Sequence, residues 1–107
     1  LDALGGAVEQ VGVADTAFVH RTSPYTVQYT ATWADPALPG ARFDSVVRGI
    51  RAAMTPYLGT GAYLNYCDAA LPDWEQAYWG ANYPRLQTVK RAVDPDGVFT
   101  FAQSVRA

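Results

Sequence analysis

Aromatic and amide side chains gather between residues 63 and 83, where the sequence places most of its candidate ligand-binding groups. The members are Tyr63, Asn65, Tyr66, Trp74, Tyr78, Trp79, Asn82 and Tyr83. Such residues can simply fill a core, although burying Tyr and Asn costs free energy unless each polar tip finds a partner. The edge of a heteroaromatic ligand alternates hydrogen-bond donors and acceptors, so it offers such partners. Two interpretations therefore stay open: a packed core, or a wall that faces an aromatic ligand.

Conventional catalytic groups are few. His20 is the only histidine, and a hydrogen-bonded structural role is favoured over a catalytic one. Cys67 is the only cysteine and has no histidine neighbour in the sequence, which favours a buried or half-buried structural thiol over a nucleophile. We expect no metal site, because the carboxylates are scattered and mostly stand beside predicted helix starts, Pro or Gly, as do Asp44, Asp73, Asp94 and Asp96.

Length and composition limit the classes of protein that fit. The 107 residues allow one domain, with a radius of gyration of about 13 Å expected for a chain of this size. Charged residues make up 17% of the chain, against about 25% in an average domain, so the surface must be unusually apolar and in need of a cover. A net charge of −2 without a basic run argues against a nucleic-acid partner. The absence of a run of about 20 apolar residues argues against a membrane partner.

Period-two alternation predicts the strands that would position these side chains. Residues 25–33 form the clearest strand, with Tyr25, Val27, Tyr29, Ala31 and Trp33 on one face. Residues 16–21 are predicted to pair with it in an antiparallel sheet, and residues 62–66 are a candidate third strand. Apolar spacing over residues 1–11 favours a short helix, weakened by two adjacent glycines.

Apolar residues at helical spacing predict the helices. A stripe over residues 43–57 is typical of an amphipathic helix. Asp73 is expected to cap a second helix that Gly80 closes, and Asn82 to cap a third with Pro84 in its first turn. The fold class is therefore α+β: a small antiparallel sheet with helices packed on one face, the open face being the ligand side.

Three stretches carry a resemblance to a known family. Residues 63–68 read YLNYCD, residues 78–86 read YWGANYPRL, and smaller matches follow at Val89-Lys90, Asp94-Pro95, Phe99 and Gln103-Ser104. In order and spacing they resemble the C-terminal segment of the berberine bridge enzyme-like FAD-linked oxidoreductases. Residues 17–21, 25–36 and 55–58 resemble the end of the same family's substrate domain more loosely.

The resemblance implies the fold of the vanillyl-alcohol-oxidase superfamily, in which a large N-terminal domain holds most of the FAD. On this basis residues 1–58 are expected to form the C-terminal part of the substrate-domain sheet and helix. Residues 59–107 are expected to form the berberine bridge enzyme-like segment, and the two parts together one compact unit. The partners implied are an N-terminal FAD-binding domain or chain and a small-molecule substrate.

The resemblance also assigns candidate site residues. Tyr63 and Asn65 match cofactor-contacting positions, and Tyr66 matches a tyrosine that several members use as catalytic base. The implied reaction transfers hydride from an alcohol, an amine or an activated C–H bond to flavin N5, and O2 or another acceptor reoxidises the flavin. A free phenol has a pKa of about 10, so base catalysis near neutral pH needs cations or donors from outside this chain. Otherwise Tyr66 only donates a hydrogen bond, and an acidic residue is the base. Cys67 is not assigned to flavin attachment.

A second function, of a different class, stays open. The chain could be a free-standing, non-catalytic module that uses the same surface to bind a protein partner or an aromatic ligand. As an enzyme, it would act as part of a larger protein or complex and would be inactive alone.

Overall fold

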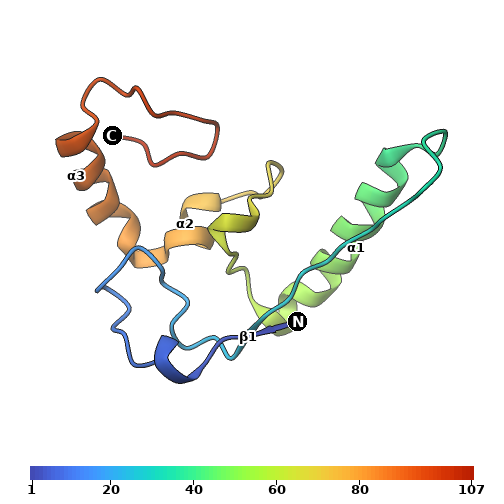
Figure 1. Cartoon of the computed structure of the whole chain (residues 1–107), viewed down its shortest axis with the longest axis horizontal. Coiled ribbons are helices and arrows are strands. Elements are labelled where there is room, and N and C mark those ends of the chain that lie inside the picture. Colours follow the sequence, from blue (N-terminus) through green and yellow to red (C-terminus); the bar gives the residue numbers. More distant parts are fainter.

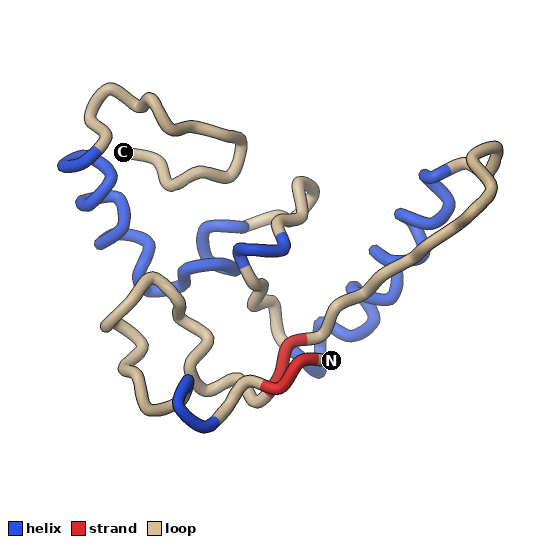
Figure 2. The backbone as a smooth tube through the Cα atoms, viewed as in Figure 1, coloured by secondary structure: helices blue, strands red, loops and turns tan.

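The computed structural model describes residues 1–107, and helices outweigh strands in it (Figures 1 and 2). The elements in chain order are β1 (Asp2–Ala3), a 3₁₀ turn (Gly6–Val8), β2 (Tyr25–Thr26), α1 (Gly40–Leu58), a 3₁₀ turn (Leu64–Tyr66), α2 (Trp74–Trp79), a 3₁₀ turn (Gly80–Asn82) and α3 (Tyr83–Val93). β1 and β2 pair antiparallel, with Asp2 opposite Thr26. A small antiparallel sheet combined with helices confirms the α+β class.

The core lies around α2. Its buried hydrophobic residues are Leu71, Trp74, Ala77, Tyr78 and Trp79, and the half-buried residues packed against them are Ala62, Leu64, Tyr83, Leu86 and Val105. Trp74 meets Trp79 edge-on with ring centroids 5.7 Å apart, and Trp79 stacks on Tyr83 at 5.6 Å. The core interpretation of the aromatic cluster is thus correct for the residues on α2.

The turn between α2 and α3 depends on Gly80. This residue has a φ of 48°, a left-handed conformation that glycine adopts without a steric penalty, and its N–H donates to the carbonyl of Gln76. Gly80 closes α2 and Pro84 lies in the first turn of α3, as predicted. Asp73 and Asn82 occupy the N-cap positions of α2 and α3, as predicted, but neither side chain makes a capping hydrogen bond. The Asn82 amide is used elsewhere, donating to the carbonyl of Val13 at 2.7 Å.

The strand predicted at residues 16–21 does not form. The Asn82 amide also donates to the carbonyl of Thr16, at 3.2 Å, which holds the start of the segment against α3. The N–H of Arg21 donates to the carbonyl of Val19 at 2.9 Å, a tight turn that is incompatible with a strand. The partner of β2 is therefore β1 and not this segment.

The helix predicted over residues 1–11 is reduced to the turn Gly6–Val8. Gly5 and Gly6 adopt φ values of 151° and 59°, both outside the right-handed helical region. The two glycines therefore interrupt a spacing that otherwise suits a helix.

Helix α1 and the extended residues 27–33 run side by side as an arm (Figure 1). Of the predicted strand 25–33, only Tyr25–Thr26 pairs with another strand. The alternation nevertheless holds in the burial pattern, because residues 27, 29 and 31 are half-buried and residues 28, 30 and 32 are exposed. At the far end of the arm Trp33 stacks on Phe43, with ring centroids 4.5 Å apart. The helix predicted over residues 43–57 is confirmed.

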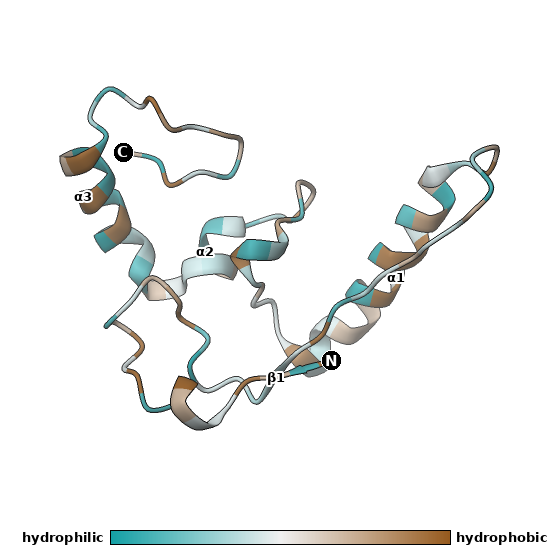
Figure 3. Cartoon of the chain, viewed as in Figure 1, coloured by the Kyte–Doolittle hydropathy of each residue, from teal (hydrophilic) through white to brown (hydrophobic).

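Outside the α2 core the packing is open. The radius of gyration is 16.3 Å, against about 13 Å expected for this length, and only 8 of the 107 residues are buried. Figure 3 shows apolar stretches along α1 and in the tail after α3 that no other part of the chain covers. This confirms the expected apolar surface. The division of the chain at residues 58 and 59 stays a prediction. None of the helices is both long and apolar enough to cross a membrane.

Candidate functional site

The predicted site residues lie on one short stretch, residues 61–68, called the site segment below. Its first half is anchored at Ala62, whose N–H donates to the carbonyl of Ala77 at 2.9 Å. The carbonyl of Ala62 lies 2.8 Å from His20 Nε2, so this nitrogen carries the proton and donates. His20 is thus hydrogen-bonded, as expected, and its structural rather than catalytic role stays a prediction. A Cβ at Gly61 would lie 3.1 Å from the His20 ring, so a larger residue would push the ring away.

The site segment is not the extended strand that was predicted over residues 62–66. It folds into the 3₁₀ turn Leu64–Tyr66, in which the N–H of Tyr66 donates to the carbonyl of Tyr63 at 3.0 Å. Residues three apart in such a turn lie on the same side. Tyr63 and Tyr66 therefore meet edge to face, with ring centroids 5.6 Å apart, whereas a strand would have placed them on opposite faces.

The two tyrosine hydroxyls differ in what they contact. The amide of Asn65 donates to the Tyr63 hydroxyl oxygen at 2.9 Å, which leaves the Tyr63 O–H free to donate elsewhere. The Tyr63 ring is fixed further by an edge contact with Phe18 at 5.8 Å. The Tyr66 side chain is 60% exposed, and its hydroxyl has no hydrogen-bond partner in the chain. Both hydroxyls can thus reach a bound molecule.

The second half of the site segment is anchored by a buried hydrogen-bond network. The Tyr78 hydroxyl accepts a hydrogen bond from the N–H of Asp68 at 3.0 Å and donates to Gln103 Oε1 at 3.1 Å. The Gln103 amide donates in turn to the carbonyl of Asp68 at 2.8 Å, which closes a ring of three bonds. Burial raises the pKa of Tyr78 above its ordinary value. Sequence reasoning gave no anchoring role to Gln103, because nothing local relates it to a residue 35 positions earlier.

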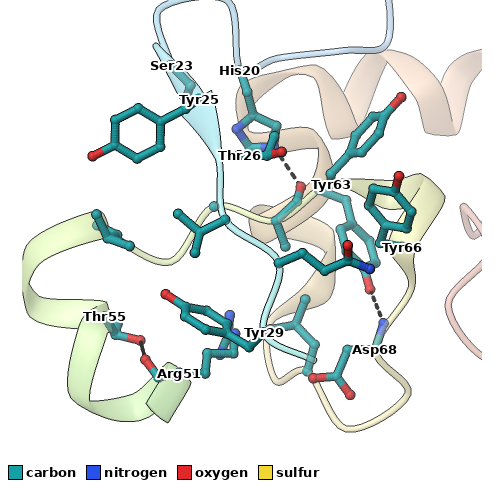
Figure 4. A pocket seen from close by; sticks show the side chains of 18 of the residues that line it. His20, Ser23, Tyr25, Thr26, Tyr29, Arg51, Thr55, Tyr63, Tyr66 and Asp68 are labelled. Carbon is teal, nitrogen blue, oxygen red and sulfur yellow. Dashed lines mark hydrogen bonds between the residues drawn. The ribbon is translucent and has the colours of Figure 1, made fainter. Parts of the chain in front are cut away.

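Both tyrosines line a cavity of about 790 Å³ between the site segment, the residues around β2 and α1 (Figure 4). This volume is typical of a small-molecule pocket. Tyr63 and Tyr66 lie on the same side of it as His20, and Arg51 enters from α1 opposite (Figure 4). Asn65 does not line the cavity. The structure therefore brings two of the three predicted site residues to one cavity and leaves the third behind them, bonded to Tyr63.

Cys67 is exposed, not buried as expected. Its Sγ donates to the carbonyl of Leu64 at 2.8 Å and so helps to close the 3₁₀ turn. No group of three or more His, Cys, Asp or Glu side chains is arranged to hold a metal ion.

A cavity with aromatic walls and the size of a small-molecule pocket thus lies beside the α2 core. Residues 62–106 match the family model described as berberine and berberine like. An FAD-linked oxidoreductase of Bacillus subtilis, YvdP, is 36% identical over 94% of this chain and 22% of its own length. Berberine bridge enzyme-like 12 of Arabidopsis thaliana is 33% identical over 98% of the chain and 23% of its own length. The aclacinomycin-N/aclacinomycin-A oxidase of Streptomyces galilaeus is 35% identical over 95% of the chain and 22% of its own length.

The chain belongs to the berberine bridge enzyme-like family of FAD-linked oxidoreductases. It spans about a fifth of the length of these relatives, whose names include FAD-linked oxidoreductases and oxidases. No solved structure matches it significantly.

Proposed function

We propose that this chain forms the tyrosine-bearing wall of the active site of an FAD-dependent oxidoreductase. In this proposal hydride leaves an alcohol, an amine or an activated C–H bond of a small substrate that occupies the cavity beside Tyr63 and Tyr66. The observation that carries the proposal is the 3₁₀ turn, because it presents two neighbouring tyrosines with free O–H groups to one cavity.

The cavity is proposed to take the flavin end of FAD. Its aromatic walls and volume suit a flat heteroaromatic ring. The chain offers no glycine-rich loop for a pyrophosphate, so the rest of the cofactor needs a second domain. An N-terminal FAD-binding domain or chain is therefore the proposed partner. When bound, FAD supplies the hydride acceptor at N5, and O2 or another acceptor regenerates it.

Each side chain has a proposed role that follows from its contacts. Tyr66 is the candidate base, because its hydroxyl is not committed to any other group. As a tyrosinate, stabilised by cations or donors from outside this chain, it would take the substrate proton as hydride leaves. Tyr63 orients a ring edge by donating its O–H. Asn65 matches a cofactor-contacting position. In this geometry its amide donates to the Tyr63 hydroxyl oxygen, so we propose that it orients Tyr63 and does not contact the cofactor itself.

The relatives' names do not identify a substrate for this chain. Aclacinomycin oxidation belongs to the Streptomyces protein, whereas the names of YvdP and of the Arabidopsis protein give no substrate. The alcohol, amine or C–H class is as far as the proposal extends.

The test uses the full-length polypeptide that contains this chain. Native mass spectrometry should find FAD bound to it, and benzyl alcohol or benzylamine, as minimal alcohol and amine probes, should reduce the flavin in the absence of O2. Tyr66→Phe should slow this reduction about 100-fold or more, the usual range for loss of a general base, while the FAD content stays unchanged.

Tyr57→Phe is the matched control, because Tyr57 also lines the cavity but is 81% exposed at the end of α1. It should reduce its flavin at the wild-type rate. A protein that carries no FAD would refute the proposal and favour the free-standing binding module. Equal rates for wild type and Tyr66→Phe would remove Tyr66 as the base.

A further inference from the structure

Two side chains that are charged at neutral pH line the cavity, and they come from different elements. Arg51 belongs to α1, and Asp68 is the last residue of the site segment. Both are half-buried. Neither takes part in an ion pair, since the ion pairs of the chain are Arg48–Asp44, Lys90–Asp94 and Arg106–Glu75. The cavity therefore holds one positive and one negative group that do not neutralise each other by direct contact.

The guanidinium of Arg51 has no partner in the chain. Its backbone carbonyl accepts a hydrogen bond from the Thr55 hydroxyl at 2.8 Å, but none of its side-chain nitrogens is bonded. Arg48, one turn earlier, is more exposed and nevertheless bonds to Asp44 at 2.8 Å. Half-burial removes part of the water that solvates a charge, so an anion in the cavity would stabilise Arg51. A carboxylate matches the planar fork of N–H donors with two parallel hydrogen bonds.

The nitrogens of Arg51 are accessible to a molecule in the cavity. The chain has one fully buried side-chain polar atom without a partner, Nε of Arg21, so the nitrogens of Arg51 are not sealed off. Figure 4 shows Arg51 entering from α1, across the cavity from Tyr63 and Tyr66. A small molecule that spans the cavity can therefore contact the guanidinium at one end and the tyrosines at the other.

Asp68 determines which end of such a molecule carries the negative charge. Its Oδ1 accepts a hydrogen bond from the N–H of Ala70 at 2.9 Å, which holds the carboxylate beside the turn that carries Tyr66. Like charges repel, so an anionic group is disfavoured at the site segment and favoured at Arg51. The walls between the two charges are mostly apolar and aromatic, which suits an apolar or aromatic body.

We propose that Arg51 binds a carboxylate of the substrate, so that the enzyme prefers aromatic or apolar acids whose oxidisable group lies at the uncharged end, beside Tyr66. The inference rests on the proposed function, because it takes the cavity to be the place where the substrate is held. In this inference Arg51 selects and orients the substrate and takes no part in proton transfer.

Calorimetric titration of the full-length polypeptide tests the charge preference without turnover. Benzoate should bind at least about 10-fold more tightly than benzamide, which has nearly the same shape, because hydrogen bonds between charged groups contribute more than neutral ones. Arg51→Met keeps a long side chain without the charge, so it should reduce this ratio to about 1 and leave the FAD content unchanged. Arg51→Lys should keep a ratio of about 3, because an ammonium retains the charge but lacks the fork.

Arg48→Met is the matched control, because Arg48 lies on the same helix but does not line the cavity. It should keep the full benzoate preference. Flavin reduction in the absence of O2 provides a second readout, with the para-hydroxymethyl derivatives of benzoate and benzamide as probes that carry the same alcohol. The acid should half-saturate the wild type at a concentration at least about 10-fold lower than the amide, and Arg51→Met should remove this difference.

Equal binding of benzoate and benzamide would overturn the inference, as would a preference that survives unchanged in both Arg51 variants. Tighter binding of benzylamine than of benzoate would show that Asp68 dominates the cavity and would overturn it as well. Loss of FAD from Arg51→Met with an unchanged preference would assign Arg51 to a cofactor phosphate, against the inference. An Arg51-dependent preference in a protein that reduces no flavin would sink only the proposed function.

Discussion

Replacing Tyr78 with phenylalanine should destabilise the fold more than any other loss of a single hydroxyl. The side chain is 2% exposed, and its hydroxyl holds both Asp68 and Gln103. Tyr78→Phe keeps the ring packed against Trp79 but leaves the Asp68 N–H without its partner and Gln103 Oε1 without its donor. A buried group left unsatisfied costs about 1–3 kcal/mol, so we expect a loss of about 2–3 kcal/mol in the free energy of unfolding.

Urea unfolding followed by tryptophan fluorescence measures this loss, because Trp74 and Trp79 lie in the same core. The control is Tyr57→Phe: this side chain is 81% exposed and has no hydrogen bond, so the change should stay within about 0.5 kcal/mol. A loss below about 0.5 kcal/mol in Tyr78→Phe would refute the view that the hydroxyl anchors the site segment.

The pH dependence of the same variant gives an independent check. Burial raises the pKa of Tyr78, so the folded state holds the phenol proton more tightly than the unfolded state. Its contribution to stability is complete below the unfolded value of about 10 and is lost as the pH rises through the folded value. Tyr78→Phe should lose this part of the alkaline fall. If the variant and the wild type lost stability in parallel above pH 10, the cause would lie elsewhere.

Two further predictions concern the anchors around α3. The hydrogen bond from Lys90 to Asp94, helped by backbone N–H groups, lowers the pKa of Asp94, so its contribution is complete above about pH 3.9 and is lost as the pH falls through the folded value. Asp94→Asn should flatten this acid limb of the unfolding curve, and an unchanged limb would contradict the assignment. Asn82→Asp should cost about 1–3 kcal/mol, because it replaces the donor to Val13 and Thr16 by a carboxylate that faces their carbonyls. Asn82 variants as stable as the wild type in thermal unfolding would show that these bonds are dispensable.

The helices after residue 40 could be predicted from local sequence, whereas the pairing of the strands could not. The stripe over residues 43–57, Gly80 and Pro84 act within one or two turns of the backbone, so spacing alone located α1 and the turn into α3. The strand prediction for residues 16–21 is wrong because their conformation depends on Asn82, which lies 66 residues from Thr16. A tertiary hydrogen bond of that range leaves no periodic signal.

The sequence predicted which tyrosines belong to the candidate site but not how they are arranged. Tyr63 and Tyr66 were identified from the resemblance, whereas the candidate strand over residues 62–66 would have placed them on opposite faces. The 3₁₀ turn brings them to one side, and bonds of Ala62 and Asp68 to His20, Tyr78 and Gln103 hold the two ends of the site segment. Whether Tyr63, Asn65 and Tyr66 act on flavin and substrate stays a prediction.

The anchors of the site segment also set when it can become ordered. Ala62 bonds to His20 across 42 positions, and Asp68 bonds to Gln103 across 35. Contacts between residues so far apart require loop closure before they stabilise anything, and this slows their formation. During synthesis the turn that carries Tyr63 and Tyr66 therefore lacks part of its C-terminal anchor until Gln103 has emerged from the ribosome. The site would be among the last parts of this region to mature, well after α1 has formed.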